Sequence, residues 1–183
     1  MGLDYPFSGR VSSATLVCVT LAALLLAGCN MVNNQKGYEP DQPIAYSHAV
    51  HAGQFQIECL FCHVGAERSR HAGVPPAQVC MNCHSQIKRD SPEVQKIDAA
   101  VESGTPIAWT RVHRLPDHAF FDHSVHVAVA GIRCQSCHGP VETMTRLRQA
   151  GTMSMGFCLD CHRKGEPSGK GPVPSTDCSA CHH

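Results

Sequence analysis

The sequence has little of what usually fills a protein interior. Only 5% of its 183 residues are aromatic, with a single Trp, whereas Gly (15), Pro (12) and His (13) are plentiful. Side chains of this composition are poor material for an apolar core. The composition therefore indicates that something other than side chains fills the interior.

The chain also lacks an excess of charge of either sign. Lys and Arg together number 15, and so do Asp and Glu, which gives a formal net charge of zero with neutral His. Proteins that bind nucleic acids or acidic partners usually carry a basic excess. The balance argues against both as targets of this protein.

The first 29 residues are typical of a targeting segment. Arg10 is followed by 17 uncharged residues, 11–27. The end of this run overlaps Leu26-Ala27-Gly28-Cys29, which resembles the site that lipoprotein signal peptidase cleaves. Cys29 would then be lipidated. The alternative is an uncleaved signal anchor, since the run is near the lower length limit for crossing a bilayer. Both alternatives predict attachment to the periplasmic face of the cytoplasmic membrane, where disulfides are permitted.

Ten of the 12 cysteines fall into five copies of C-x-x-C-H, the attachment signature of c-type haem. On a helical turn, residues i and i+3 share a face, so both cysteines can form thioethers to one porphyrin while the following His reaches the iron. The sequence predicts five covalently bound haems c. The thioether cysteines are Cys59, Cys62, Cys80, Cys83, Cys134, Cys137, Cys158, Cys161, Cys178 and Cys181, and the proximal histidines are His63, His84, His138, His162 and His182.

The remaining cysteines are Cys18, inside the targeting segment, and Cys29, at its cleavage site. None is left for a structural disulfide. The competing interpretations are zinc ribbons and dithiol redox sites, which also use C-x-x-C. Zinc does not require a His after every second Cys, so five full copies favour haem.

A repeat suggests where the distal ligands come from. His48 and His51 precede Cys59 in the same register in which His123 and His126 precede Cys134. A low-spin haem takes an axial ligand on each side, and the motif histidines supply only one. The three-residue spacing lets two imidazoles serve different haems. We therefore predict His48, His51, His123 and His126 as four distal ligands.

The fifth distal ligand is left open by the sequence. We favour His113, with Met155 as its rival, because a Met would raise the potential of its haem. The other candidates are His118, Met144, His71 and His183.

The predicted fold is mainly α with much irregular coil, a multihaem cytochrome c fold in which the haems are the core. With roughly 30 residues for each haem, the haems must contact one another. Ser91-Pro92-Glu93 predicts a helix start and Gly104 its end. A second helix is predicted over 141–150, and 105–120 is predicted to be extended.

Two dihaem modules and a separate fifth haem give the predicted organisation. Its segments are 1–29 for targeting, 30–90 for the first dihaem module, 91–120 for a helix and extended connector, 121–163 for the second dihaem module, and 164–183 for a linker and the fifth haem.

The stretches 112–118, 121–123, 137–142 and 155–163 together resemble the pentahaem cytochrome c subunit of alternative complex III. The likeness covers most of 44–163. It implies an electron-transfer subunit, not itself an enzyme, of a quinol-oxidising respiratory complex. Its implied partners are iron-sulfur and membrane subunits upstream, and a monohaem cytochrome c or terminal oxidase downstream. In class III multihaem cytochromes, which the chain also resembles, a His pair before the first motif serves two haems.

Two other functions are compatible with five haems. A free-standing lipoprotein could shuttle electrons without a partner complex. A multihaem reductase, for example one acting on nitrite or hydroxylamine, needs an iron with an open position, which a variant motif often signals. All five motifs end in His, so the reductase is the less favoured of the two.

Overall fold

The computed structural model describes residues 13, 17–19, 35–165 and 173–183. It divides the chain into two units, Met1–Asn34 and Gln35–His183. The first unit holds the predicted targeting segment, and its cleavage site with Cys29 lies outside the described residues. None of the described helices has the length and apolar character needed to cross a bilayer.

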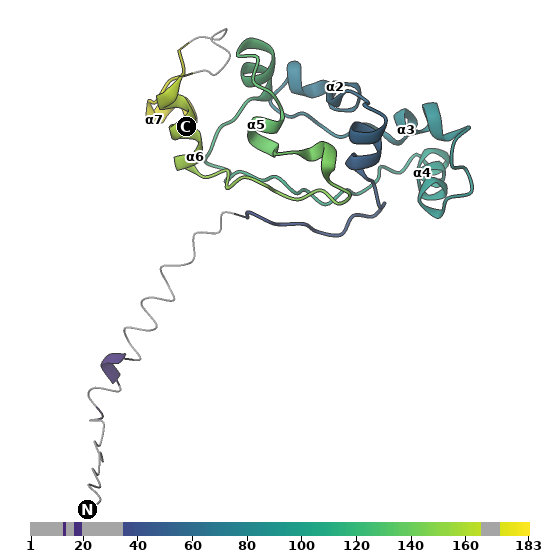
Figure 1. The fold of residues 1–183 in the computed structure, drawn as a ribbon, viewed down its shortest axis with the longest axis horizontal. Coiled ribbons are helices and arrows are strands. Elements are labelled where there is room, and N and C mark those ends of the chain that lie inside the picture. The colour runs from purple at the N-terminus through teal and green to yellow at the C-terminus, as the bar shows by residue number, and fades with distance from the viewer. Residues whose placement is uncertain (1–12, 14–16, 20–34, 166–172) are drawn as a thin grey trace, which may run out of the picture. The chain divides into compact units, whose positions relative to one another are not determined.

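The second unit consists of short helices joined by long irregular connections (Figure 1). No strand occurs in its described residues, 35–165 and 173–183, which confirms the predicted helix and coil character. The elements are the π-helix η1 (Ala49–Gln54), α2 (Cys59–Cys62), the 3₁₀-helix η2 (Val64–Glu67), α3 (Ala77–His84), α4 (Pro92–Ser103), the π-helix η3 (Val125–Val129), α5 (Gln135–His138), the 3₁₀-helix η4 (Val141–Thr143), α6 (Met155–Lys164) and α7 (Cys178–Cys181).

Helix α4 begins and ends where the sequence predicts. Ser91 is its extended N-cap residue, Pro92 occupies the first turn, and Gly104 ends it in the left-handed conformation with φ 64°. The buried side chains of α4 are Val94 and Ile97. Ile97 joins Ile44 and Ala77 in a small apolar cluster. Within residues 35–165 and 173–183, the side chains thus form their apolar cluster around α3 and α4.

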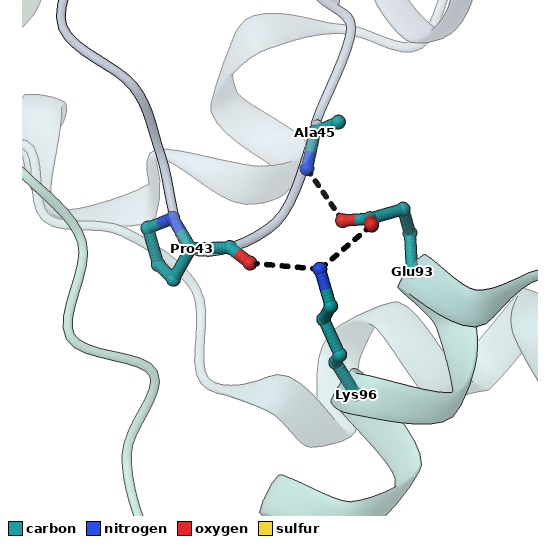
Figure 2. A network of polar contacts seen from close by, with 4 residues as sticks. All are labelled: Pro43, Ala45, Glu93 and Lys96. Carbon is teal, nitrogen blue, oxygen red and sulfur yellow. Dashed lines mark hydrogen bonds and ion pairs between the residues drawn. The ribbon is translucent and has the colours of Figure 1, made fainter.

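A polar network ties the chain ahead of η1 to α4 (Figure 2). The Glu93 carboxylate accepts a hydrogen bond from the Ala45 amide at 2.7 Å and pairs with the Lys96 ammonium at 2.7 Å. Lys96 also donates to the Pro43 carbonyl at 3.3 Å. The network fixes residues 43–45, which lead directly into the first H-x-x-H pair.

Replacing Glu93 with Gln should lower the unfolding temperature of the haem-loaded protein slightly, by about 2 °C, because the pair is exposed to solvent. The hydrogen bonds from Lys96 and Ala45 hold the pKa of Glu93 below its ordinary 4.5. A depressed carboxyl pKa stabilises the fold above the ordinary value and loses that effect as the pH falls. The difference between parent and E93Q in thermal melts should therefore begin to shrink below about pH 4.5 and vanish once the pH lies below the depressed pKa of Glu93. A difference that grows with acidification would contradict the network.

The predicted helix over 141–150 is wrong. Only the short η4 forms, and the chain then runs without helix to α6. Its backbone groups are bound elsewhere: the Met144 carbonyl accepts from the Ala49 amide at 2.9 Å, and Gln149 exchanges two backbone hydrogen bonds with Gly37 and Tyr38. These long-range bonds replace those a helix would make.

The connector 105–120 contains neither helix nor strand, as predicted. It runs along the unit from α4 toward η3, and Ile107 and Trp109 pack on the apolar cluster. The Gln42 side chain bridges the amide and carbonyl of Thr110, with both contacts at 2.9 Å. A side chain thus supplies the hydrogen bonds that a neighbouring strand would otherwise offer.

Candidate functional site: five pairs of facing histidines

Each C-x-x-C-H motif lies on one helical turn. The first, second, fourth and fifth are carried by α2, α3, α6 and α7, and the third starts at the N-cap residue of α5. The amides of His63, His138 and His182 each donate to the carbonyl of the first Cys of their motif at 2.9 Å. The local fold therefore places both cysteines and the His of each motif on one turn, as thioether attachment requires.

Each motif histidine faces a second histidine ring from elsewhere in the chain. The ring-centre distances are 6.5 Å for His48 and His63, 6.1 Å for His51 and His84, 6.3 Å for His123 and His138, 6.2 Å for His126 and His162, and 5.7 Å for His118 and His182. Metal–imidazole bonds of about 2 Å on both sides of one ion separate the ring centres by roughly 6 Å. All five pairs fit an ion held between the two rings.

Backbone carbonyls set the proton position on seven of these ten rings. A carbonyl can only accept, so each contact places the proton on Nδ1 and leaves the Nε2 lone pair for a metal. The contacts are His51 to Ser47 (2.9 Å), His63 to Gly73 (2.7 Å), His84 to Ile87 (3.0 Å), His123 to Arg70 (2.9 Å), His126 to Asp122 (2.7 Å), His162 to Ser175 and His182 to His118 (2.8 Å). Nδ1 of His48 is buried without a hydrogen-bond partner within the described part of the chain.

An aromatic ring orients each H-x-x-H pair. Tyr46 stacks on His51 at 4.4 Å between ring centres and meets His48 edge-on at 4.9 Å. Phe121 repeats this arrangement in the second half, at 4.4 Å from His126 and 4.8 Å from His123. The sequence analysis missed this role, although the aromatic residue stands two positions before the His pair in both repeats.

Replacing Phe121 with Ala should loosen His123 and His126, because each ring contact contributes about 1 kcal/mol beyond burial. We expect carbon monoxide to bind to part of the ferrous haem in this variant, which visible spectroscopy detects. The matched change Tyr46→Phe keeps the ring and should leave the spectrum as in the parent. Carbon monoxide binding in Y46F but not in F121A would contradict the orienting role of the rings.

Burial keeps two of these imidazoles, His48 and His138, neutral. Desolvation, followed by the neighbouring His63 and His51, lowers the pKa of His48 to about 4. Desolvation, followed by His113, His123 and His63, likewise lowers the pKa of His138 to about 4. Both rings therefore keep a lone pair available to a metal at neutral pH.

Among the described residues, His118 is the one candidate histidine whose ring is found opposite His182. His113 meets His138 edge-on, with 4.4 Å between ring centres, and desolvation by burial lowers its pKa. Met144 is buried, with 2% of its surface exposed, whereas Met155 is 66% exposed. His71 is exposed, and His183 packs against Phe120 at 4.7 Å. The sequence offered no signal that would select His118 over these residues.

In the described segments, no three His, Cys, Asp or Glu side chains converge on a common point suited to a metal ion. Structural zinc needs four protein ligands, whereas haem iron takes four from its porphyrin and needs only the two axial ones from the protein. Ring pairs flanked by a C-x-x-C turn match the haem requirement.

Two comparisons with known proteins agree with this site. Residues 119–183 match the family described as cytochrome c7 and related cytochrome c. The chain is also 36% identical over 101 residues to the multiheme cytochrome c subunit of menaquinone reductase from Nitratidesulfovibrio vulgaris. This match covers 55% of the chain and 47% of that relative, so the chain spans about half the length of the relative. The C-terminal region is thus similar to multihaem cytochromes c, which carry covalently bound haem and transfer electrons.

Proposed function

We propose that this chain is a five-haem, membrane-attached c-type cytochrome that transfers electrons within a quinone-linked respiratory complex. The observation that supports this best is the set of five facing histidine pairs, one for every C-x-x-C-H motif. A relative named as a menaquinone reductase subunit supports the link to quinone. The resemblance to the alternative complex III subunit supports a place in a larger complex.

In this proposal the ten motif cysteines bind the haems through thioethers, and His63, His84, His138, His162 and His182 are the proximal ligands. The distal ligands are His48, His51, His123, His126 and His118, so that His118 takes the place for which the sequence favoured His113. When bound, each haem iron takes up and releases one electron. The carbonyl contacts hold the Nδ1 protons, and Tyr46 and Phe121 hold the ring planes.

This ligand set favours electron transfer over catalysis. A multihaem reductase needs an iron with one position open to its substrate, whereas here a second His ring lies opposite each motif histidine and would fill that position. The protein would lie at the periplasmic face of the cytoplasmic membrane, attached through a lipidated Cys29 or a signal anchor. Its partners would be iron-sulfur and membrane subunits, with a monohaem cytochrome c or a terminal oxidase as acceptor.

The relative's name favours a second candidate, in which electrons pass from the haems to menaquinone instead of from a quinol to the haems. The same chain residues would serve either direction. Two mixing experiments distinguish the directions. Menaquinol added to the oxidised complex should produce the reduced haem band if electrons pass from quinol to haem, and menaquinone added to the reduced complex should remove that band if they pass from haem to quinone.

Purification from the native membrane in mild detergent tests the proposal. We expect iron-sulfur and membrane subunits to accompany the chain, and its intact mass to include five haems. A monodisperse cytochrome without partners would instead support the free-standing shuttle. A colourless protein, or one that binds zinc, would refute both.

The change Cys29→Ser should abolish lipid attachment, whereas a native peptide starting at Met1 would support the signal anchor.

A further inference from the structure

The two halves of the second unit contact one another through equivalent residues. Residues of the two repeats are 75 positions apart, as His48 is from His123. The amide of Ala49 donates to the carbonyl of Met144 at 2.9 Å, and the amide of Ser124 donates to the carbonyl of Ser69 at 3.2 Å. Each residue in the second bond is the repeat counterpart of one in the first.

The packing of the short helices has the same reciprocity. Helix η1 of the first half packs on η4 of the second, and η3 of the second half packs on η2 of the first. Element A of the first half touches element B of the second half, and element A of the second half touches element B of the first. A twofold axis generates this exchange. The two halves are therefore related by an internal pseudo-twofold axis.

A twofold axis brings equivalent points together where they lie close to it. Helix η2, which directly follows the first motif, packs on η3, and η4, which follows the third motif, packs on η1. Cys59 and Cys134, the first cysteines of these two equivalent motifs, are such a pair, since after burial it is the neighbouring Cys59 that raises the pKa of Cys134. The first and third attachment motifs are therefore neighbours at the centre, although 75 residues separate them along the chain.

The remaining motifs lie outward from this centre. His48 and His51, one turn apart on the chain, face the first and second motif histidines, and His123 and His126 do the same for the third and fourth. Figure 1 shows α2 and α5 between two ends, one occupied by α3 and α4 and the other by α6 and α7.

Hydrogen bonds and ring contacts place the fifth motif beside the fourth. The Phe120 amide donates to the Cys181 carbonyl at 2.7 Å. The next residue, Phe121, lies 4.4 Å between ring centres from His126, which faces the fourth motif histidine. Nδ1 of His162 also contacts the carbonyl of Ser175, three residues before the fifth motif.

We infer that the five haem attachment sites follow one another through the molecule in the order second, first, third, fourth, fifth. The haem sites at the two ends of the electron path are then those of Cys80 and Cys83 and of Cys178 and Cys181. The first motif in the sequence then holds an internal haem of this path. This inference rests on the proposed five-haem loading and adds the order that the sequence does not contain.

Nuclear Overhauser spectra of the fully reduced, diamagnetic protein test the order without any substitution. We expect cross-peaks between the Cys59 and Cys134 thioether protons or their attached haem edges. Cross-peaks from the haem of Cys80 and Cys83 to that of Cys134, with none from Cys59, would overturn the order.

Removal of single haems provides a second test, read by electron paramagnetic resonance of the oxidised protein. The double change Cys59→Ser and Cys62→Ser should remove an internal haem and leave the second one isolated, with the signal of one uncoupled low-spin iron. The matched change Cys80→Ser and Cys83→Ser should remove a terminal haem and leave no isolated spin. The opposite pair of results would establish the order of the sequence instead.

The haem count separates failure of this inference from failure of the proposed function. Intact mass of the unsubstituted protein is measured first, and fewer than five haems would defeat the proposed function. Five haems combined with the opposite spectra would overturn the order alone.

Discussion

Replacing His118 with Ala should convert roughly one-fifth of the haem from low spin to high spin, because one of five irons loses an axial ligand. His118 faces His182 with 5.7 Å between ring centres and an interplanar angle of 26°. Its backbone carbonyl also accepts from Nδ1 of His182, a contact that the substitution keeps. The reduced variant should therefore bind one carbon monoxide per molecule, which the shift of the visible haem bands measures.

The control is His113→Ala. His113 meets His138 edge-on, with 4.4 Å between ring centres and an interplanar angle of 87°, and His138 already faces His123. We expect the spectrum of H113A to remain fully low spin, with no carbon monoxide bound. The reverse result, a high-spin fraction in H113A and none in H118A, would restore His113 as the fifth distal ligand.

The change Gly53→Ala should destabilise the haem-loaded protein by about 1–3 kcal/mol, as overpacking in a tight interior does. A Cβ atom at Gly53 would come within hard contact of the Glu142 backbone carbonyl oxygen. The clash falls between η1 and η4, and backbone atoms have little freedom to move aside. We expect a lower denaturant midpoint and partial loss of the low-spin spectrum, since η1 carries His51.

Gly156→Ala is the matched control for this prediction. A Cβ at Gly156 would meet the Ser154 hydroxyl at 3.8 Å, an ordinary contact, and the residue lies inside α6, where Ala is preferred to Gly. G156A should therefore unfold at the same denaturant concentration as the parent or a higher one. Equal midpoints for G53A and the parent would show that η1 and η4 do not pack closely.

Local signals in the sequence predicted local structure well. Ser91, Pro92 and Gly104 delimit α4 as their cap preferences require. The repeat of H-x-x-H before C-x-x-C-H identified four histidines whose rings face motif histidines in the structure. Their role as ligands remains a prediction, as do the five domain segments.

Long-range contacts account for what the sequence did not predict. The segment 141–150 has helical spacing of its apolar residues, but Met144 and Gln149 use their backbone groups to bind distant segments of the chain. His118 lies within the irregular connector 105–120, outside the H-x-x-H repeat, so the register of the repeat could not identify it. Its partner His182 is 64 residues away, and only the folded chain shows that the two rings face each other.

The two central histidine pairs are equivalent in the repeat but differ in hydrogen bonding. Nδ1 of His123 donates to the Arg70 carbonyl, whereas Nδ1 of its counterpart His48 is buried without a hydrogen-bond partner among the described residues. An imidazole that shares its Nδ1 proton is a stronger donor to iron and favours the oxidised metal. If haems are bound at both sites as proposed, an electron shared between them would thus rest preferentially on the haem beside His48, and the centre of the molecule would favour one direction of transfer despite its symmetric backbone.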